Sequence, residues 1–350
     1  MSGLGGDRAQ NAREENISPC SSPNLELWRF FAIKGCFHIP ATTCANRRDS
    51  TSAQRRRKEQ RSSEESCAVG SRSALTAWRC FRAPIAADMR LLLLQMGRAA
   101  EVSSALHDKF GDVHVWFRQA LALREGEALD VIVVSEGNQL PSAQEVMAKY
   151  SGVLVSGSVK MVTDRLDWSE NAAGFLKDLV REPSNKTPVL GVCYGHQLLA
   201  HALGGKVQYN SLGRSMGTFQ LTLTEAASRD ELFSCYNDYS KPIFMHASHM
   251  QHVYDAPKDA VVLASNSRDR FHALRFAPRI WGTQFHPEFT CGVLNEHIIA
   301  RREILIREGR DPDQMVRETR EADGAVLLQR FAFICRSRSE NRRGNNLAKL

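Results

Sequence analysis

The sequence has no long apolar run and no regular framework of cysteines. Its 350 residues contain no stretch of about 18 or more apolar residues, which argues against a transmembrane helix. The nine cysteines include no Cys-Xaa-Xaa-Cys pair, and their spacing is irregular. This pattern, together with the absence of a secretory leader pattern, argues against a disulfide scaffold and favours a reducing compartment. We therefore expect a protein of the cytosol.

Phosphate-binding loops are also missing. The sequence contains no Gly-Xaa4-Gly-Lys-Ser/Thr motif, which argues against a P-loop nucleotide site. What is present is the composition of an ordinary globular protein, with 43% hydrophobic and 24% charged residues. A chain of this length can bury a large core without disulfides. We therefore expect a folded domain with no cofactor.

Positive charge is concentrated near the two ends of the chain. The formal net charge is +7; residues 1–88 contribute +5, residues 336–350 contribute +4, and residues 89–335 contribute −2. Nucleic-acid binding requires a basic face on the folded domain or an ordered basic arm. The charge distribution therefore argues against a nucleic-acid partner, and the lack of a long apolar run argues against a membrane partner.

The composition changes near Met89. Residues 1–88 lack a helix or strand period and are rich in Arg and Ser, so we interpret them as a disordered basic extension. Their RRRK run at 55–58 would serve as a nuclear address, although a solvated charge run is the simpler interpretation. Because Met89 would serve as a start, it stays open whether the extension belongs to the natural protein. A domain over 89–336 and a disordered basic tail over 337–350 complete the predicted organisation.

From Met89 onward, short apolar strands alternate with helical patterns. This alternation is typical of an α/β domain with a mainly parallel sheet. The second half is richer in strands, so part of the sheet is expected to be antiparallel. The predicted strands are 90–96, 129–134, 151–158, 187–192, 217–224, 242–247, 260–266 and 279–289, and the predicted helices are 101–121, 167–182, 194–203, 295–309 and 324–336.

One predicted strand runs into a cysteine that stands between two glycines. The stretch VLGVCYGHQLLA, residues 189–200, places Cys193 at a sharp turn from strand to helix, with Gly191 and Gly195 on either side. Such a turn exposes a nucleophile at the carboxyl edge of an α/β sheet. The positive end of the following helix favours a thiolate, and the backbone N–H of Tyr194 would face a developing oxyanion.

A thiol nucleophile also needs a base and a group that orients the base. The stretch QFHPEF, residues 284–289, supplies His286 and Glu288. In an extended segment, residues two apart point to the same side, so Glu288 would bind one imidazole nitrogen while the other faces Cys193. Gly157, at the end of the strand in VSGS, offers a second backbone donor for the oxyanion.

These motifs carry a resemblance to a known family. GVCYGHQLLA, followed about ninety residues later by GTQFHPEF, resembles the class I glutamine amidotransferase domain over roughly residues 89–310. The resemblance implies a flavodoxin-like, mostly parallel sheet with an added antiparallel part and helices on both faces. It also implies a Cys-His-Glu triad that hydrolyses glutamine to glutamate and ammonia through a γ-glutamyl thioester. The implied residues are catalytic Cys193, His286 and Glu288, oxyanion donors Gly157 and Tyr194, and substrate-binding Gln197, Ser248 and His249.

The sequence departs from the family pattern at the substrate's far end. In MHASHMQHV, residues 245–253, the family often has a Ser-His-Gly-Asp-like segment, which Met250 and Gln251 do not match. The stretch SGSVKMVTD, residues 156–164, lacks the common Gly-Pro after the oxyanion glycine. These features resemble stand-alone, GMP synthase-like proteins, a branch that includes plant γ-glutamyl peptidases. No SGGxDS-type loop of an ATP pyrophosphatase domain occurs, so any synthetase that accepts the ammonia is expected to be a separate chain.

Three functions stay open at this level. The first is hydrolysis of glutamine, and the second is γ-glutamyl peptidase activity on glutathione-like peptides. The third is a non-catalytic regulator that retains the fold, which the intact Cys-His-Glu set disfavours. The three histidines His246, His249 and His252 match no standard zinc spacing, so we predict no metal site.

Overall fold

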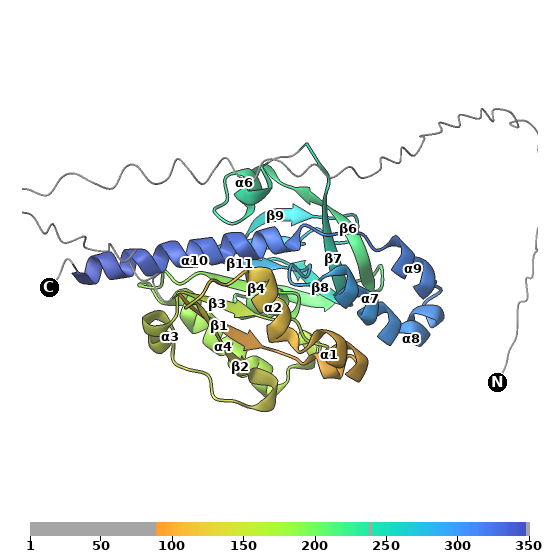
Figure 1. Ribbon diagram of the computed structural model, residues 1–350, viewed down its shortest axis with the longest axis horizontal. Coiled ribbons are helices and arrows are strands. Elements are labelled where there is room, and N and C mark those ends of the chain that lie inside the picture. Colours follow the sequence, from red (N-terminus) through yellow and green to blue (C-terminus); the bar gives the residue numbers. More distant parts are fainter. Residues whose placement is uncertain (1–88, 238–239, 348–350) are drawn as a thin grey trace, which may run out of the picture. The chain divides into compact units, whose positions relative to one another are not determined.

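The computed structural model describes residues 89–237 and 240–347 (Figure 1). All of them belong to one compact unit, Trp78–Leu350. The extension predicted over residues 1–88 lies outside the described residues. Among the described residues, the cysteines at 193, 235, 291 and 335 are free thiols. No helix in the described part of the chain has both the length and the apolar character needed to span a membrane.

A nine-stranded sheet forms the centre of the unit. Five neighbouring strands are mutually parallel and follow the order β2-β1-β3-β4-β11. This is the strand order of flavodoxin-like folds, in which ligands bind at the carboxyl ends of the strands. The predicted fold class is therefore confirmed. The bounds are β1 Arg90–Gln95, β2 Ala128–Val133, β3 Gly152–Val155, β4 Val189–Val192 and β11 Ile280–Thr283.

The added antiparallel part extends the sheet beyond β11. Strands β10, β9, β6 and β7 follow in that order, and each pairs with its neighbour in antiparallel fashion. A separate pair, β5 and β8, was not predicted because both strands are short and mostly polar. The bounds are β5 Lys206–Tyr209, β6 Ser215–Leu223, β7 Ile243–His249, β8 Gln251–Asp255, β9 Val261–Ser265 and β10 Ala273–Ala277.

Helices cover both faces of the sheet. Alternate residues of β1 enter two different cores: Leu91 and Leu93 pack with α2, α7 and α10, whereas Leu92 and Leu94 pack with α3, α4 and α5. Figure 1 shows α10 and α2 over the same part of the sheet. The α-helix bounds are α1 Ser104–Phe110, α2 Val113–Leu121, α3 Ala143–Lys149, α4 Asp167–Arg181, α5 Tyr194–Ala202, α6 Glu225–Ser228, α7 Cys291–Ala300, α8 Arg302–Arg307, α9 Pro312–Glu318 and α10 Gly324–Leu347. Four 3-10 helices complete the described elements, at Ala99–Glu101, Val134–Glu136, Val162–Asp164 and Phe233–Tyr236.

Two predicted helices are each divided in two. The helix expected over 101–121 is interrupted at Gly111, whose φ of 74° is left-handed, and Asp112 then caps α2 with its carboxylate. The helix expected over 295–309 is interrupted at Arg301, with φ −110° and ψ 16°. In both places the apolar period continues across the break, so periodicity alone could not detect it.

The predicted disordered tail is wrong for residues 337–347, because α10 continues to Leu347. Three basic side chains beyond Cys335, those of Arg336, Arg338 and Arg342, bond to groups of the domain. Arg336 forms a two-pronged ion pair with Glu127, with N–O distances of 2.5 and 2.8 Å. Arg338 donates to the Tyr150 carbonyl at 2.7 Å and to the Thr187 hydroxyl at 2.9 Å. The basic composition of this segment predicted a solvated tail. The acceptors that hold it on the domain come from distant parts of the chain, so the local sequence could not reveal them.

We predict that Arg338→Met lowers the free energy of unfolding by about 2 kcal/mol, because a charged donor is removed from the Tyr150 carbonyl at the end of α3. Thermal or urea unfolding followed by circular dichroism measures the change. Arg317→Met is the matched control, since Arg317 is 68% exposed and lies 3.9 Å from Asp311. Equal unfolding midpoints for the two variants would show that α10 is not held through Arg338.

Candidate active site

Three neighbouring strand ends bring the predicted site residues together. β3, β4 and β11 are adjacent and parallel, so their carboxyl ends share one edge of the sheet. Cys193 directly follows β4, Gly157 is the second residue after β3, and His286 is the third residue after β11. Residues more than a hundred positions apart therefore meet at the edge where α/β domains place their ligands.

Cys193 lies in a strained backbone conformation. Its φ of 52° and ψ of −100° are rare for a residue with a side chain, and such conformations cost on the order of 1–3 kcal/mol. Two hydrogen bonds hold the turn: the Cys193 N–H donates to the Thr283 carbonyl at 2.7 Å, and the Gly195 N–H donates to the Ser156 carbonyl at 3.2 Å. The turn thus projects the thiol from the sheet edge at the first turn of α5.

The two flanking glycines are required by close packing. A Cβ at Gly191 would lie 2.5 Å from the Gly195 carbonyl oxygen, and a Cβ at Gly195 would lie 2.4 Å from the Val155 carbonyl oxygen. Only hydrogen atoms fit in these gaps. The glycines therefore let the start of α5 pack directly on β3 and β4, which holds Cys193 at the tip.

His286 connects Cys193 to Glu288. The imidazole Nδ1 donates to Glu288 Oε1 at 2.8 Å, and the ring lies close enough to Cys193 for the two groups to interact electrostatically. All three side chains are buried, and the imidazole stacks on Phe289 with ring centroids 4.0 Å apart. The predicted contact is present, but its premise was wrong: β11 ends at Thr283, and Glu288 lies in a turn rather than in an extended strand.

The electrostatics of the site favour an imidazolium. Burial by itself lowers the pKa of His286, but the Glu288 carboxylate and Cys193 outweigh burial and raise it to about 10. The surrounding low-dielectric protein strengthens this attraction. The arrangement can therefore hold a thiolate beside a protonated base, as thiol nucleophiles require.

The two predicted oxyanion donors flank the thiol. Tyr194 is the first residue of α5, where the helix supplies no acceptor for its backbone N–H. Its ring points into the core, and its hydroxyl lies 2.6 Å from Ser169 Oγ. At Gly157, a Cβ would lie 2.9 Å from the His286 ring. The Ser156 carbonyl accepts a hydrogen bond from the Gly195 N–H. The C=O and N–H of a trans peptide point in opposite directions, so the Gly157 N–H points away from Gly195.

A cavity of about 180 Å³ lies beside the thiol. The three predicted substrate-binding residues, Gln197, Ser248 and His249, all line it together with Cys193. Their hydrogen bonds shape its wall: Gln197 Nε2 donates to the Gln251 carbonyl at 2.7 Å, and His249 Nδ1 donates to the same carbonyl at 2.9 Å. The segment around Met250 that departs from the family pattern is thus part of the cavity.

Sequence reasoning missed two arginines of this cavity, Arg214 and Arg301. Arg301 also lines a smaller cavity of about 50 Å³ that contains His286 and Glu288. A signal for Arg301 existed, since it lies one helical turn after His297 in a row that is otherwise apolar. Arg214 lies in a polar turn, where an arginine gives no such signal.

Only one group among the described residues places three metal-type ligands together. Ligand atoms of His249, Asp269 and His272 lie within 4.8 Å of one another and would be the ones to hold an ion. The His272 ring, however, already interacts with Asp269 Oδ2 at 3.4 Å and accepts from Asn266 at 3.2 Å. Of the histidine triplet considered in the sequence, His246 contacts Thr218 instead. The hydrogen bonds among Asp269, His272 and Asn266 therefore explain this group as polar packing behind His249.

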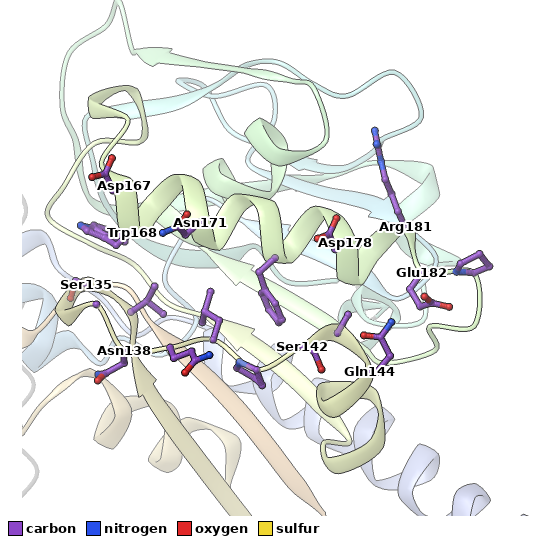
Figure 2. Close-up of a pocket in the computed structure, with 18 residues that line it drawn as sticks. Ser135, Asn138, Ser142, Gln144, Asp167, Trp168, Asn171, Asp178, Arg181 and Glu182 are labelled. Carbon is purple, nitrogen blue, oxygen red and sulfur yellow. The ribbon is translucent and has the colours of Figure 1, made fainter.

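A far larger cavity lies elsewhere. Figure 2 shows a groove of about 1150 Å³ beside α4, with polar and charged side chains such as Asp167, Asp178 and Arg181 around it. It shares no lining residue with the cavity at Cys193. Cavity size alone would therefore place the site wrongly, whereas the strand ends and the strained cysteine place it at the sheet edge.

We predict that Gly195→Ala lowers kcat and destabilises the fold by roughly 1–3 kcal/mol, because the new methyl group would overlap the Val155 carbonyl and displace Cys193. Gly174→Ala is the matched control. Its Cβ meets nothing within 4 Å in the exposed face of α4, so it should stabilise the protein by about 1 kcal/mol. Unfolding midpoints and activity are measured for both variants; wild-type behaviour of Gly195→Ala would contradict the packing argument.

Comparison with known proteins agrees with this geometry. The family model for glutamine amidotransferase class-I matches residues 112–305. The chain is 27% identical over 202 residues to gamma-glutamyl peptidase 5 of Arabidopsis thaliana, which covers 57% of this chain and 78% of that protein. It is also 32% identical over 146 residues to a glutamine-hydrolyzing GMP synthase subunit of Methanopyrus kandleri. The aligned segment covers 41% of this chain and 70% of that protein.

A solved structure supports the fold. A glutamine amidotransferase from Thermotoga maritima aligns with a TM-score of 0.53 and 17% identity, covering 72% of this chain and 99% of that one. The relatives named above are enzymes, and the family match spans the segment from α2 to α8, which contains Cys193, His286 and Glu288. This chain belongs to the class-I glutamine amidotransferase family of enzymes.

Proposed function

We propose that the chain hydrolyses γ-glutamyl amide bonds through a thioester on Cys193, as glutamine amidotransferases do with glutamine. The observation that carries the proposal is the buried contact of Cys193 with the His286–Glu288 pair beside a cavity of about 180 Å³. This assembly unites the three parts that nucleophilic catalysis by a thiol needs: a nucleophile, a base and an orienting group.

In the first half of the reaction, the Cys193 thiolate attacks the γ-carbonyl carbon and a carbon–sulfur bond forms. The carbonyl oxygen becomes an oxyanion, which the N–H groups of Gly157 and Tyr194 stabilise. The carbon–nitrogen bond then breaks as the His286 imidazolium gives its proton to the departing nitrogen. The products of this half are a γ-glutamyl thioester and ammonia or an amine.

In the second half, water attacks the thioester carbon while neutral His286 takes a proton from it. The carbon–sulfur bond breaks, glutamate leaves, and the thiolate–imidazolium pair is restored. Glu288 accepts the hydrogen bond from Nδ1 and holds that proton in place, so Nε2 carries out both proton transfers. The buried and stacked imidazole cannot rotate away between the two halves.

Two substrates fit this chemistry. With glutamine the product is ammonia, which a separate synthetase chain would consume; the GMP synthase subunit among the relatives supports such a partner. With a γ-glutamyl peptide the leaving group is an amine, which the similarity to gamma-glutamyl peptidase 5 supports. The complete Cys-His-Glu set argues against a purely regulatory role. We propose the cytosol as the site of action, with the RRRK run at 55–58 as a candidate nuclear address.

We predict that Cys193→Ala lowers turnover of glutamine or γ-glutamyl peptide by roughly 10⁴–10⁶-fold without unfolding the domain, because no other group can form the thioester. Acid-quenched wild-type enzyme should carry a glutamyl adduct in mass spectrometry, and the variant should not. Cys235→Ala is the control, since burial raises the pKa of that thiol to about 12 and keeps it unreactive. Full activity in Cys193→Ala would reject the nucleophile assignment.

We predict that Glu288→Gln shifts the alkaline limb of the kcat/KM profile to lower pH by about 1–3 units. The imidazolium is lost as pH rises through the His286 pKa of about 10, and removing the Glu288 charge lowers that pKa. The profile is measured from pH 6 to 11. Glu303→Gln, at an exposed position of α8, should leave the limb in place. An unmoved limb in Glu288→Gln would show that this carboxylate does not tune His286.

A further inference from the structure

The ionisable side chains that line the cavity beside Cys193 give it a positive charge. Its lining includes three cationic side chains, Lys160, Arg214 and Arg301, and no carboxylate. His249 does not add to this charge, because burial lowers its pKa to about 3. The family's Ser-His-Gly-Asp-like segment would end in an acid here, but this chain has Gln251 instead. The cavity is therefore electrostatically suited to an anion.

Arg301 is a partly buried cation of this cavity that has no carboxylate partner among the described residues. Its Nη1 contacts the Nδ1 and the carbonyl oxygen of His297, both at 3.3 Å, and no carboxylate of residues 89–237 or 240–347 forms an ion pair with it. Burial and the neighbouring Arg214 lower its pKa to about 10. A partly buried guanidinium without an anionic partner is costly, so a bound anion would be favoured.

Arg214 also contributes positive charge to the cavity, although a carboxylate partner offsets part of that charge. Its side chain is 9% exposed, and its Nε bonds to Glu308 at 3.1 and 3.2 Å. Within the described part of the chain, Glu308 therefore pairs with Arg214 only, and it leaves Arg301 without a carboxylate partner. The break between α7 and α8 at Arg301 directs that residue to the wall, since it is the one residue between the two helices.

We propose that Arg301, assisted by Arg214, binds a carboxylate of the leaving group, so that the enzyme prefers γ-glutamyl peptides over glutamine. This inference rests on the proposed function. The glutamyl part carries one ammonium and one carboxylate in both substrates, but only a peptide has a further carboxylate on the side of the departing nitrogen. A guanidinium binds a carboxylate through paired N–H donors, which a neutral amide or ammonia cannot reproduce.

The test uses the full chain and two substrates that differ in one group, γ-glutamylglycine and γ-glutamylglycinamide. We expect wild-type kcat/KM to favour the acid by roughly 10–100-fold, which corresponds to one charged hydrogen-bonding partner. Arg301→Met should reduce that ratio to near 1, mainly through KM. Arg302→Met is the matched control, because Arg302 is its exposed neighbour paired with Asp313, and it should retain the ratio.

Several outcomes would overturn the proposal. A wild-type ratio near 1 would do so without any variant, so the test survives if Arg301→Met does not fold. An unchanged ratio in folded Arg301→Met would remove Arg301 from recognition. Equal loss with both substrates and with glutamine would assign the arginine to the glutamyl α-carboxylate instead.

Binding measured by calorimetry on Cys193→Ala separates the inference from the proposed function. If wild type turns over neither substrate, the hydrolysis proposal fails. A preference of Cys193→Ala for the acid, lost in Cys193→Ala/Arg301→Met, would still support the carboxylate site. Equal affinity for acid and amide would reject it.

Discussion

The contact between the first turn of α5 and the ends of β3 and β4 controls the geometry of the whole site. At Gly191 and Gly195 the backbones approach so closely that no methyl group fits, and the strained φ of Cys193 persists because this packing fixes both sides of the turn. The same contact sets the first N–H groups of α5 around the thiol. The strain at Cys193 and its place at the positive end of α5 are therefore consequences of one packing constraint.

Burial has opposite consequences for the charged groups around Cys193. His286 is surrounded by Glu288 and the thiol, so burial strengthens an attraction that already favours its charged form. Arg301 is half-buried without a carboxylate partner in the described ranges, so an anionic ligand could neutralise its charge. His246 has no carboxylate partner among the residues that the structure describes, and burial lowers its pKa to about 4. Burial also lowers the pKa of His249, and the nearby Asp269 carboxylate does not offset it. For these side chains, the balance between the burial cost and the neighbouring charges decides the direction of the pKa shift.

Sequence-based prediction succeeded where the signal is local and failed where it depends on distant partners. The strand before Cys193 and the helix after it follow from an apolar run and a Gly-Xaa-Cys-Xaa-Gly turn. The tail over 337–350 was predicted as disordered because the acceptors of Arg338, the Tyr150 carbonyl and the Thr187 hydroxyl, lie 188 and 151 positions away. The contact of His286 with Glu288 was predicted on the wrong premise, since a tight turn rather than an extended strand joins them.

The sequence by itself determined the chemistry available to this protein. A cysteine between two glycines, a His-Pro-Glu segment and alternating strands and helices predict a thiol nucleophile on an α/β sheet, because each is a local pattern with a local physical cause. Only the tertiary structure decided which charges face the substrate. Arg214 and Arg301 come from different elements, and they meet because β6, α7 and the break after α7 converge on one cavity. No spacing along the chain encodes that convergence, since it depends on how the sheet and helices pack together.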